Sequence, residues 1–386
     1  MKICFFANSD FYLVKSRLNL IRELKKIGWD VYVCCPETNG DFVNDLVGAG
    51  ATFLPSRIKR GIGFFSNIFY FFQIKNICKQ YRFDLCHNFT PKVSILGSWA
   101  QKSSGIKNIV CSISGLGYVY SSSGIFYKIL QFIVNRCYRS VFNICSRVIF
   151  QNPDDLKLFL NKKIVKKEKT ELIFGSGIDS DYFQKEKAEI GKIEEIKRQL
   201  NLNGEVVVTM ISRLLWQKGV REFVEASEKI KNSKTKFVLV GPIDKESPDC
   251  VPSKNISEWE RLGLIQYLGD RKDVREILFL SDIFVFPSYY REGIPKVLLE
   301  AGSMEKPLVA VDNVGTREIV EDGVNGFLVR AQKAQDLSEA IIKLMDNPSL
   351  RQRFGVAARQ KILQHFSDEI VINKTTEVYG SLMTKS

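Results

Sequence analysis

Residues 206–220 read VVVTMISRLLWQKGV, and this stretch decides the fold class of the chain. The run Val206–Ile211 is apolar or β-branched without interruption, as in a strand that is buried on both faces of a parallel sheet. Arg213 and Lys218 follow in a short loop, and a helical pattern begins after Gly219. The order strand, loop, helix predicts a βαβ unit with both cations at the carboxyl end of its strand.

The same alternation of strand-like and helix-like segments runs along the whole chain. Other strands are expected at residues 2–7, 30–35, 84–87, 107–113, 147–150, 236–240, 283–286 and 307–311. This pattern predicts an α/β fold with parallel sheets. Because 386 residues exceed what one core usually holds, we expect two Rossmann-like domains, at residues 1–180 and 181–366, with a cleft between them.

The positive charge of the chain is concentrated in its first half. The net charge is +13, and residues 1–180 hold 25 Lys and Arg against 12 Asp and Glu. Such an asymmetry indicates an anionic partner, either nucleic acid, acidic lipid headgroups or a phosphorylated substrate, although charge that serves only solubility stays open. The sequence lacks the pattern of any nucleic-acid-binding module, so we expect no nucleic-acid partner.

Residues 57–82 combine basic and aromatic side chains in the sequence RIKRGIGFFSNIFYFFQIKNICKQYR. This composition fits an interfacial membrane helix, to which the basic run KKIVKKEK at 162–169 could add, and it fits a core-facing helix equally well. The longest uncharged apolar run, 61–74, is shorter than the ~20 residues of a spanning helix. With scattered cysteines and no signal-peptide pattern, the chain is expected in the cytoplasm, peripheral on the inner face of the membrane.

A second informative stretch, residues 286–304, reads FPSYYREGIPKVLLEAGSM. Gly293, Ile294 and Pro295 are expected to open a helix whose free N–H groups can bind an anion. Glu292 lies at that end, and Glu300 follows two turns later on a similar face, where a carboxylate can accept both hydroxyls of a ribose. The same stretch also fits a capped helix with two surface glutamates.

The two cations of the first stretch complement these carboxylates. Arg213 and Lys218, at the end of a strand, can clamp a diphosphate and neutralise a departing nucleotide, with arginine as a planar fork and lysine as a point charge. A solvated loop is the alternative for this segment. Neither stretch alone identifies a protein family, whereas the combination of the two does.

Together with later motifs, the chain resembles glycosyltransferase family 4. The motifs are RLxxxKG at 213–219, PSxxxEGxPxxxLEA at 287–301, PLVAVDNVG at 307–315 and EDGVNGFLV at 321–329. The resemblance implies the GT-B fold, with two facing domains, an interdomain cleft and a C-terminal helix at about 367–386 that packs back on the first domain. It also implies transfer of a sugar with retention of anomeric configuration.

A narrower resemblance points to a bacterial subgroup of that family. It rests on HNFTPK at 87–92, SGLGYV at 114–119, FQNPDD at 150–155 and PSYYREG at 287–293. Members add an N-acetylhexosamine, often N-acetylgalactosamine, to a sugar on undecaprenyl diphosphate during O-antigen, capsule and glycoprotein-glycan assembly. The donor implied is a UDP-sugar.

By this resemblance, each predicted residue takes a role. Arg213 and Lys218 would bind the donor diphosphate, Glu292 the transferred sugar and Glu300 the ribose. The backbone N–H groups at Gly293 and Ile294, just before Pro295, would hold the sugar or a phosphate.

In the first domain, His87 is expected to follow a strand and to lie at the rim of the cleft. An imidazole there could hydrogen-bond the donor sugar or assist the acceptor hydroxyl, while a structural histidine is the alternative. Lys92, in the same expected loop, could bind the acceptor diphosphate or be a surface lysine. The sequence departs from many relatives at 7–17, ANSDFYLVKSR, which has no glycine, and residues 114–117 could supply flexible backbone instead.

The sequence predicts no cofactor and no metal site. It contains only two histidines, and fixed cations together with a helix dipole could stabilise the leaving diphosphate. The UDP-sugar is then a substrate, and the reaction is expected to be metal-independent. Two alternatives stay open, namely a nucleotide-sugar epimerase of the same fold and a non-enzymatic protein that binds membrane or nucleic acid.

Overall fold

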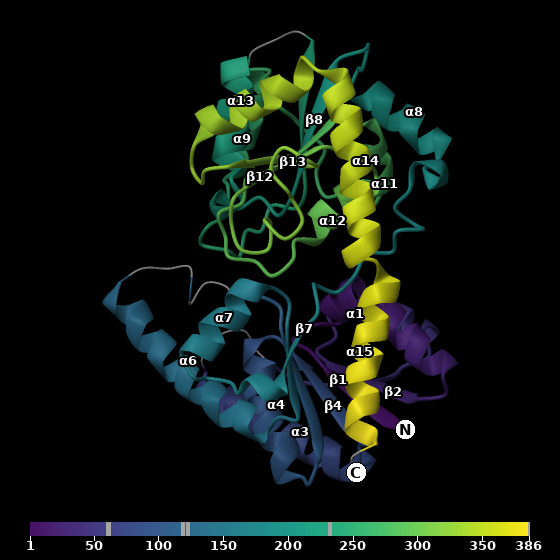
Figure 1. Ribbon diagram of the computed structural model, residues 1–386, viewed down its shortest axis with the longest axis vertical. Helices are drawn as coiled ribbons and strands as arrows, with labels where there is room; N and C mark the ends of the chain where they lie inside the picture. The colour runs from purple at the N-terminus through teal and green to yellow at the C-terminus, as the bar shows by residue number, and fades with distance from the viewer. Residues whose placement is uncertain (59–62, 117–119, 121–123, 231–233, 385–386) are drawn as a thin grey trace. The chain divides into compact units, whose positions relative to one another are not determined.

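The computed structural model describes residues 1–58, 63–116, 120, 124–230 and 234–384 (Figure 1). The chain divides into two compact units, Met1–Gly177 with Asp368–Ser386 and Ile178–Ser367. The predicted division at 180/181 lies three residues later than this one, and the helix predicted at about 367–386 spans Asp368–Met383. Parts of two sequence features, 57–82 and SGLGYV, fall at 59–62 and 117–119, outside the described residues.

The first unit is built on a sheet of seven parallel strands in the order β3-β2-β1-β4-β5-β6-β7. The strands are β1 (Lys2–Phe6), β2 (Asp30–Cys35), β3 (Thr52–Pro55), β4 (Leu85–Phe89), β5 (Asn108–Ile113), β6 (Arg147–Phe150) and β7 (Thr170–Leu172). Successive side chains of β1 point to opposite faces. Ile3 and Phe5 therefore enter one core and Cys4 and Phe6 another.

Helices cover both faces of this sheet. They are α1 (Asp10–Lys26), α2 (Gly40–Gly48), α3 (Phe64–Tyr81), α4 (Pro91–Ser103), α6 (Ile125–Ile144), α7 (Pro153–Asn161) and α15 (Asp368–Met383), with the 3₁₀ turn η1 (Lys167–Lys169). Helices α3, α4 and α6 contribute to the core that contains Cys4, whereas α1 and α15 contribute to the core that contains Ile3. The last helix of the chain thus completes the first unit (Figure 1).

Helix α3 is partly a core-facing helix, which was one of the two alternatives for residues 57–82. Tyr70 and Ile74 are buried in the core of the first unit, so one side of the helix is structural. Phe65 and Phe69 are exposed, at 84% and 53%. Among the described residues, no helix is both long enough and apolar enough to cross a membrane.

The second unit has a sheet of six parallel strands in the order β10-β9-β8-β11-β12-β13. They are β8 (Val206–Ile211), β9 (Thr235–Val240), β10 (Gln266–Tyr267), β11 (Ile283–Phe286), β12 (Leu308–Val311) and β13 (Gly326–Val329). The helices are α8 (Ile190–Gln199), α9 (Val220–Ile230), α10 (Ser253–Arg261), α11 (Val274–Leu280), α12 (Lys296–Ser303), α13 (Ala334–Met345) and α14 (Pro348–His365), with 3₁₀ turns η2 (Lys185–Lys187) and η3 (Trp216–Lys218).

The prediction of two Rossmann-like α/β units is confirmed. Each sheet is parallel, and each reverses its strand order beside its first strand, between β1 and β4 and between β8 and β11. Ligands of such sheets bind beyond the carboxyl ends of the strands at this reversal. In the second unit, a ligand site is therefore expected at the segments that follow β8 and β11.

His87 is a buried link between the sheet of the first unit and α15. Its Nδ1 is 2.5 Å from the Tyr379 hydroxyl and its Nε2 is 2.7 Å from Ser112 Oγ. The expectation that His87 follows a strand and lies at a rim is wrong, because β4 continues through Phe89. Burial, assisted by the positive charge of Arg17, lowers the pKa of His87 well below its ordinary value.

This burial predicts that the first unit loses stability in mild acid. Below about pH 6.5 the unfolded chain protonates His87 while the folded chain resists, so protons favour unfolding. Between about pH 7.5 and about pH 5.5, this residue should remove about 1.4 kcal/mol from the free energy of unfolding. Urea titrations at both pH values measure the difference.

The variant His87→Gln should unfold with little change between these two pH values. His365→Gln is the matched control, because His365 is exposed at the end of α14 and should leave the pH dependence of the parent intact. A His87→Gln protein with the pH dependence of the parent would show that another group is responsible.

Candidate active site

The predicted residues of the second unit gather at the reversal of strand order in its sheet. Strand β8 ends at Ile211 and is followed by η3, which contains Lys218. Strand β11 ends at Phe286 and is followed by the loop that contains Glu292. Because β8 and β11 are paired neighbours, both segments leave the same edge of the sheet.

Gly219 allows these two segments to touch. Its φ is +81°, and a Cβ atom on it would lie 2.3 Å from the carbonyl oxygen of Pro287, so no larger residue fits without displacing backbone. The backbone N–H groups of Tyr289 and Tyr290 donate to the carbonyl oxygen of Gln217 at 3.1 and 3.3 Å. The loops after β8 and β11 are therefore joined through their main chains.

Lys218 and Glu292 form an ion pair at this junction. Lys218 is only 8% exposed, and its Nζ lies 5.3 Å from the ring centre of Tyr290 and 5.8 Å from that of Phe286. The electron-rich ring faces stabilise a cation that has lost much of its water. Ser288 Oγ also donates to Glu292 Oε1 at 3.3 Å, so the carboxylate is oriented by two partners.

Arg213 has a different carboxylate partner. Its Nη1 lies 2.9 Å from Asp244 Oδ2, in the segment that follows β9, and its side chain is 54% exposed. Gly241, with φ +134°, brings that segment against the Ser212 carbonyl oxygen, which a Cβ atom would approach to 1.8 Å. The two predicted cations therefore follow the same strand but are held by separate acidic groups.

A third loop, after β12, supports the loop that carries Glu292. Gly315 has φ +87°, and a Cβ atom on it would lie 1.6 Å from the Gly293 carbonyl oxygen. Asn313 Nδ2 donates to the Tyr290 carbonyl oxygen at 3.0 Å. Neither residue was predicted as part of the site, although PLVAVDNVG at 307–315 contains both and its final glycine was the available signal.

Helix α12 starts slightly later than the sequence suggested. Its first residue is Lys296, and Pro295 precedes it with φ −65° and an extended ψ of 113°. Gly293 and Ile294 thus belong to the loop between Glu292 and the helix. Glu300 lies in the second turn of α12 and is half-buried.

Two further ionisable groups close to this loop are affected by burial. Glu222 lies in the first turn of α9, directly after the Lys218–Gly219 segment, and desolvation raises the pKa of its carboxyl group. Desolvation also raises the pKa of the Tyr289 phenol, and the negative charge of Glu222 adds to that shift. Both groups are therefore partly withdrawn from solvent.

The structure thus unites Lys218, Glu292 and Gly293 through direct contacts of their loops. Arg213 follows the same strand as Lys218, and Glu300 follows on the helix after Gly293. His87 belongs to the first unit, where both ring nitrogens are hydrogen-bonded within the core.

In the part of the chain that the structure describes, no group of three or more His, Cys, Asp or Glu side chains is arranged to hold a metal ion. The sequence does contain one Asp-x-Asp triplet, Asp179–Ser180–Asp181, in an exposed turn. Asp179 Oδ1 accepts a hydrogen bond from the Tyr182 backbone N–H at 2.8 Å, as a turn-forming aspartate does.

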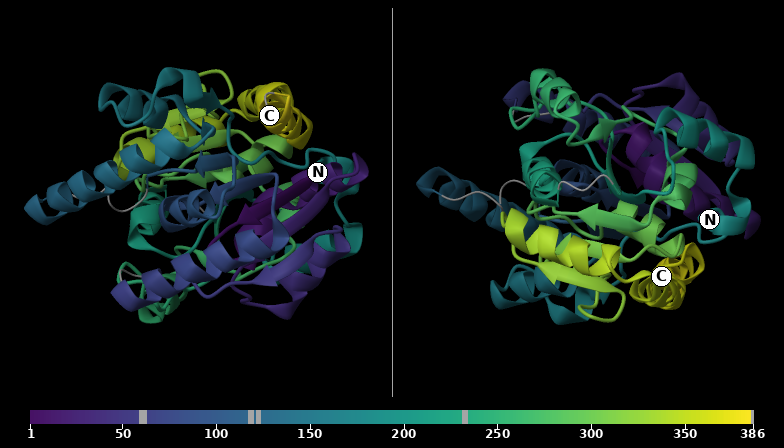
Figure 2. Two further views of the ribbon diagram at one scale, coloured as in Figure 1. Left: turned by 90° about the horizontal axis from the view of Figure 1, so that it is seen from below. Right: turned by 90° about the horizontal axis from the view of Figure 1, so that it is seen from above.

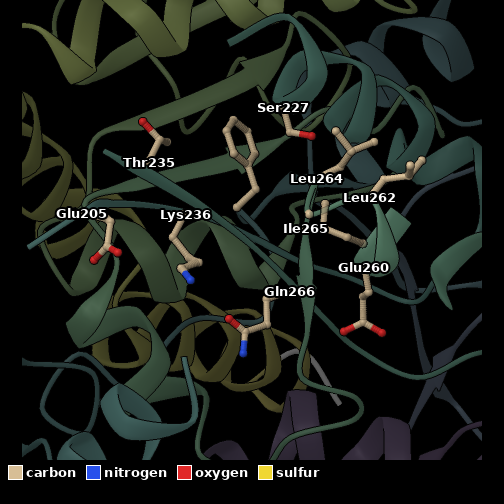
Figure 3. Close-up of a pocket in the computed structure, with 11 residues that line it drawn as sticks. Glu205, Ser227, Thr235, Lys236, Glu260, Leu262, Leu264, Ile265 and Gln266 are labelled. Carbon is tan, nitrogen blue, oxygen red and sulfur yellow. The ribbon is translucent and has the colours of Figure 1, made fainter. Parts of the chain in front are cut away.

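A pocket of about 490 Å³ lies elsewhere in the second unit (Figure 3). Its lining includes Glu205, Lys236 and Gln266, which stand at the amino ends of β8, β9 and β10. This is the opposite edge of the sheet from the Lys218–Glu292 pair. None of the predicted site residues lines this pocket, so it is separate from the candidate active site.

Comparison with known proteins identifies the family. Residues 2–151 match the family model "Glycosyl transferase 4-like", and residues 192–361 match "Glycosyl transferases group 1". An N,N'-diacetylbacillosaminyl-diphospho-undecaprenol alpha-1,3-N-acetylgalactosaminyltransferase from Campylobacter jejuni is 30% identical over 384 residues, which cover 99% of both chains.

A second relative agrees with this assignment, and a solved structure shares the fold. A UDP-Gal:alpha-D-GlcNAc-diphosphoundecaprenol alpha-1,3-galactosyltransferase from Escherichia coli is 25% identical over 91% of this chain and 89% of its own. The structure of Anabaena HepE in complex with UDP and glucose shares the fold, with a TM-score of 0.83 at 20% identity, over 99% of this chain and 100% of that one. The chain belongs to glycosyltransferase family 4 and has the GT-B fold of that family.

Proposed function

We propose that this glycosyltransferase moves a hexose or N-acetylhexosamine from a UDP-sugar to a saccharide linked to polyprenyl diphosphate, with retention of configuration. N-acetylgalactosamine is the donor sugar that we favour. The observation that carries the proposal is the Lys218–Glu292 pair at the strand reversal of the second unit. It combines a desolvated cation for a phosphate with a carboxylate for sugar hydroxyls.

The names of the relatives support the choice of donor and acceptor. The Campylobacter jejuni relative is named for N-acetylgalactosamine transfer, and the Escherichia coli relative for a UDP-galactose donor. Both names specify a sugar on a diphospho-undecaprenol acceptor. We therefore propose an undecaprenyl-diphosphate saccharide as the acceptor and a surface polysaccharide, O-antigen or capsule, as the product.

The roles of the residues follow from their chemistry. Lys218 would place its ammonium group against a donor phosphate, with Arg213 as a second cation for the diphosphate. Glu292 would accept hydrogen bonds from hydroxyls of the transferred sugar, and Glu300 from the ribose hydroxyls. The main-chain N–H groups at Gly293 and Ile294, before Pro295, would complete the binding of the sugar or phosphate.

Transfer would proceed at the anomeric carbon of the donor. The bond from this carbon to the phosphate oxygen breaks and UDP departs, while the acceptor hydroxyl forms the new bond from the same side. The acceptor proton passes to an oxygen of the departing diphosphate. The protein supplies fixed positive charge where negative charge develops, and we propose that neither a metal ion nor a cofactor takes part.

The acceptor and the charge distribution also support a location. A polyprenyl carrier lies in a membrane, and the excess of positive charge is confined to residues 1–180. Each Lys or Arg near an anionic bilayer contributes ~1 kcal/mol of attraction. We propose a cytoplasmic enzyme that associates peripherally with the inner face of the membrane and that does not act on nucleic acid.

The variants Lys218→Gln and Glu292→Gln test the central pair. Each should reduce kcat/KM by about 100-fold or more, because a preorganised charge at the reacting centre is lost. Radiolabelled donor and a polyprenyl-diphosphate saccharide provide the assay. Lys229→Gln, at an exposed lysine of α9, is the matched control and should retain full activity. Full activity of Lys218→Gln in folded protein would exclude the assignment.

Replacement of Glu300 tests the ribose contact. Glu300→Gln should weaken UDP binding by about 10- to 100-fold, because hydrogen bonds to an ionised carboxylate contribute about 1.5–3 kcal/mol. Titration calorimetry with UDP measures this without any acceptor. Glu258→Gln, at an exposed glutamate of α10, should bind UDP as the parent does. Unchanged UDP affinity in Glu300→Gln would mean that the ribose lies elsewhere.

A donor screen tests the overall reaction. Purified protein, an undecaprenyl-diphosphate saccharide and individual UDP-sugars should give the highest turnover with UDP-N-acetylgalactosamine. NMR of the product should show the α-configuration of the donor, and EDTA should leave the rate unchanged. An inverted product, or activity that EDTA abolishes and Mg²⁺ restores, would contradict the mechanism. Conversion of a UDP-sugar without acceptor would indicate an epimerase.

A further inference from the structure

We infer that the exposed face of α6 and an adjoining basic pocket form the surface through which the first unit docks on an anionic lipid bilayer. The inference deepens the peripheral location in the proposed function and rests on it to that extent. It identifies the contacting surface, which the charge distribution of the sequence alone does not do.

The amino-terminal half of α6 presents large apolar side chains to solvent. Ile125, Ile129, Phe132 and Ile133 are 75%, 55%, 67% and 52% exposed. Their spacing places them on one side of a helix. Clustered exposed apolar side chains of this kind indicate an interaction surface rather than ordinary scatter. Figure 2 shows this helix reaching past the other elements of the first unit.

The carboxyl-terminal half of the same helix anchors it. Tyr138, Val141 and Phe142 are buried in the core of the first unit. Tyr138 and Phe142 stack at 5.1 Å between ring centres, and Tyr138 also meets Phe159 of α7 edge-on at 5.5 Å. The exposed half is therefore an extension of a firmly packed helix, which can present its side chains without refolding.

A pocket of about 310 Å³ borders the apolar face and is lined by four cationic side chains, Lys128, Arg136, Arg139 and Lys162. Phe132 and Ile164 contribute apolar surface to the same lining. No carboxylate is among the described residues of this lining, and the sequence of α6 contains no Asp or Glu. The pocket therefore suits a phosphate group with an attached hydrocarbon.

Arg139 holds the two parts of this surface together. Its Nε donates to the Lys163 carbonyl oxygen at 3.0 Å and its Nη2 to the Lys162 carbonyl oxygen at 2.9 Å. These bonds fasten the start of the basic run 162–169 beside α6. Lys162, Lys163, Lys166 and Lys167 are all exposed, so the run extends the positive surface beyond the pocket.

The chemistry favours a bilayer over other anionic partners. Aliphatic and phenyl side chains can enter the boundary between headgroups and acyl chains while adjacent cations contact lipid phosphates. A nucleic acid would need aromatic platforms for its bases, whereas three of the four exposed large apolar side chains that the structure describes on α6 are isoleucine. Charge and apolar surface are adjacent here, as an interface between water and lipid requires.

The test is co-sedimentation with vesicles of phosphatidylglycerol and phosphatidylcholine, compared with phosphatidylcholine alone, in the absence of donor and acceptor. The parent protein should bind the anionic vesicles, and added salt should weaken binding. Ile129→Ser with Phe132→Ser, and separately Lys128→Glu with Arg136→Glu, should each lower the partition coefficient by about tenfold or more.

Matched controls carry comparable changes, from apolar residues to serine and from cations to glutamate, on exposed residues of the second unit. Val356→Ser with Leu363→Ser on α14, and Lys229→Glu with Lys254→Glu on α9 and α10, should bind vesicles as the parent does. Phe69→Ser with Phe72→Ser tests α3, whose exposed phenylalanines are the competing surface. Thermal melts establish that each variant is folded.

The inference is overturned if the α6 variants bind anionic vesicles like the parent, if only the α3 variant loses binding, or if an oligonucleotide displaces the vesicles. A further assay uses a short, water-soluble prenyl-diphosphate saccharide. The α6 variants should retain transfer to it, which separates the docking surface from the chemistry. If the parent binds vesicles but transfers no sugar, the proposed reaction fails while the docking surface stands.

Discussion

The contact between Gly219 and the Pro287 carbonyl is the constraint on which the site depends. Only a residue without Cβ lets the loop after β8 lie against the loop after β11, and this contact sets Lys218 beside Glu292. Gly315 likewise allows a close backbone contact, with the Gly293 carbonyl oxygen of the loop after β11. A buried ion pair contributes little net stability by itself, because desolvation offsets the attraction. In the proposed reaction, the two charges would instead serve to bind the donor phosphate and the transferred sugar.

The surroundings of this pair take the place of the water from which Lys218 is largely withdrawn. The rings of Tyr290 and Phe286 face the Lys218 ammonium group, and Ser288 Oγ donates a hydrogen bond to the Glu292 carboxylate. An anionic ligand that approaches Lys218 would meet a cation with few waters to displace, which favours binding. Arg213 differs, since its side chain is half exposed and its partner Asp244 comes from the segment after another strand. The two cations thus differ in their freedom to move: Lys218 is held within its surroundings, whereas the Arg213 side chain can change its conformation more readily.

Much of this architecture was predictable, and the failures have identifiable physical causes. Strands β2, β6, β8 and β11 were located to the residue because unbroken apolar runs mark strands buried on both faces. His87 was misplaced because Asn88 looked like the start of a loop. Asn88 is instead buried within β4, where Gln101 and Ser98 satisfy its side-chain amide. The partner of Arg213 could not be predicted, since Asp244 lies 31 residues away and only the fold brings it near.

Helix α15 has a consequence for how the protein is made. The final helix supplies Val371, Val378 and Tyr379 to a core whose other members come from the first part of the chain. On the ribosome, residues 1–177 therefore lack part of their core until α15 has been synthesised. The second unit, Ile178–Ser367, is contiguous and has no such dependence. The second unit can therefore fold before the first unit is complete, and a nascent chain would expose the apolar surface that α15 covers until residues 368–383 have left the ribosome.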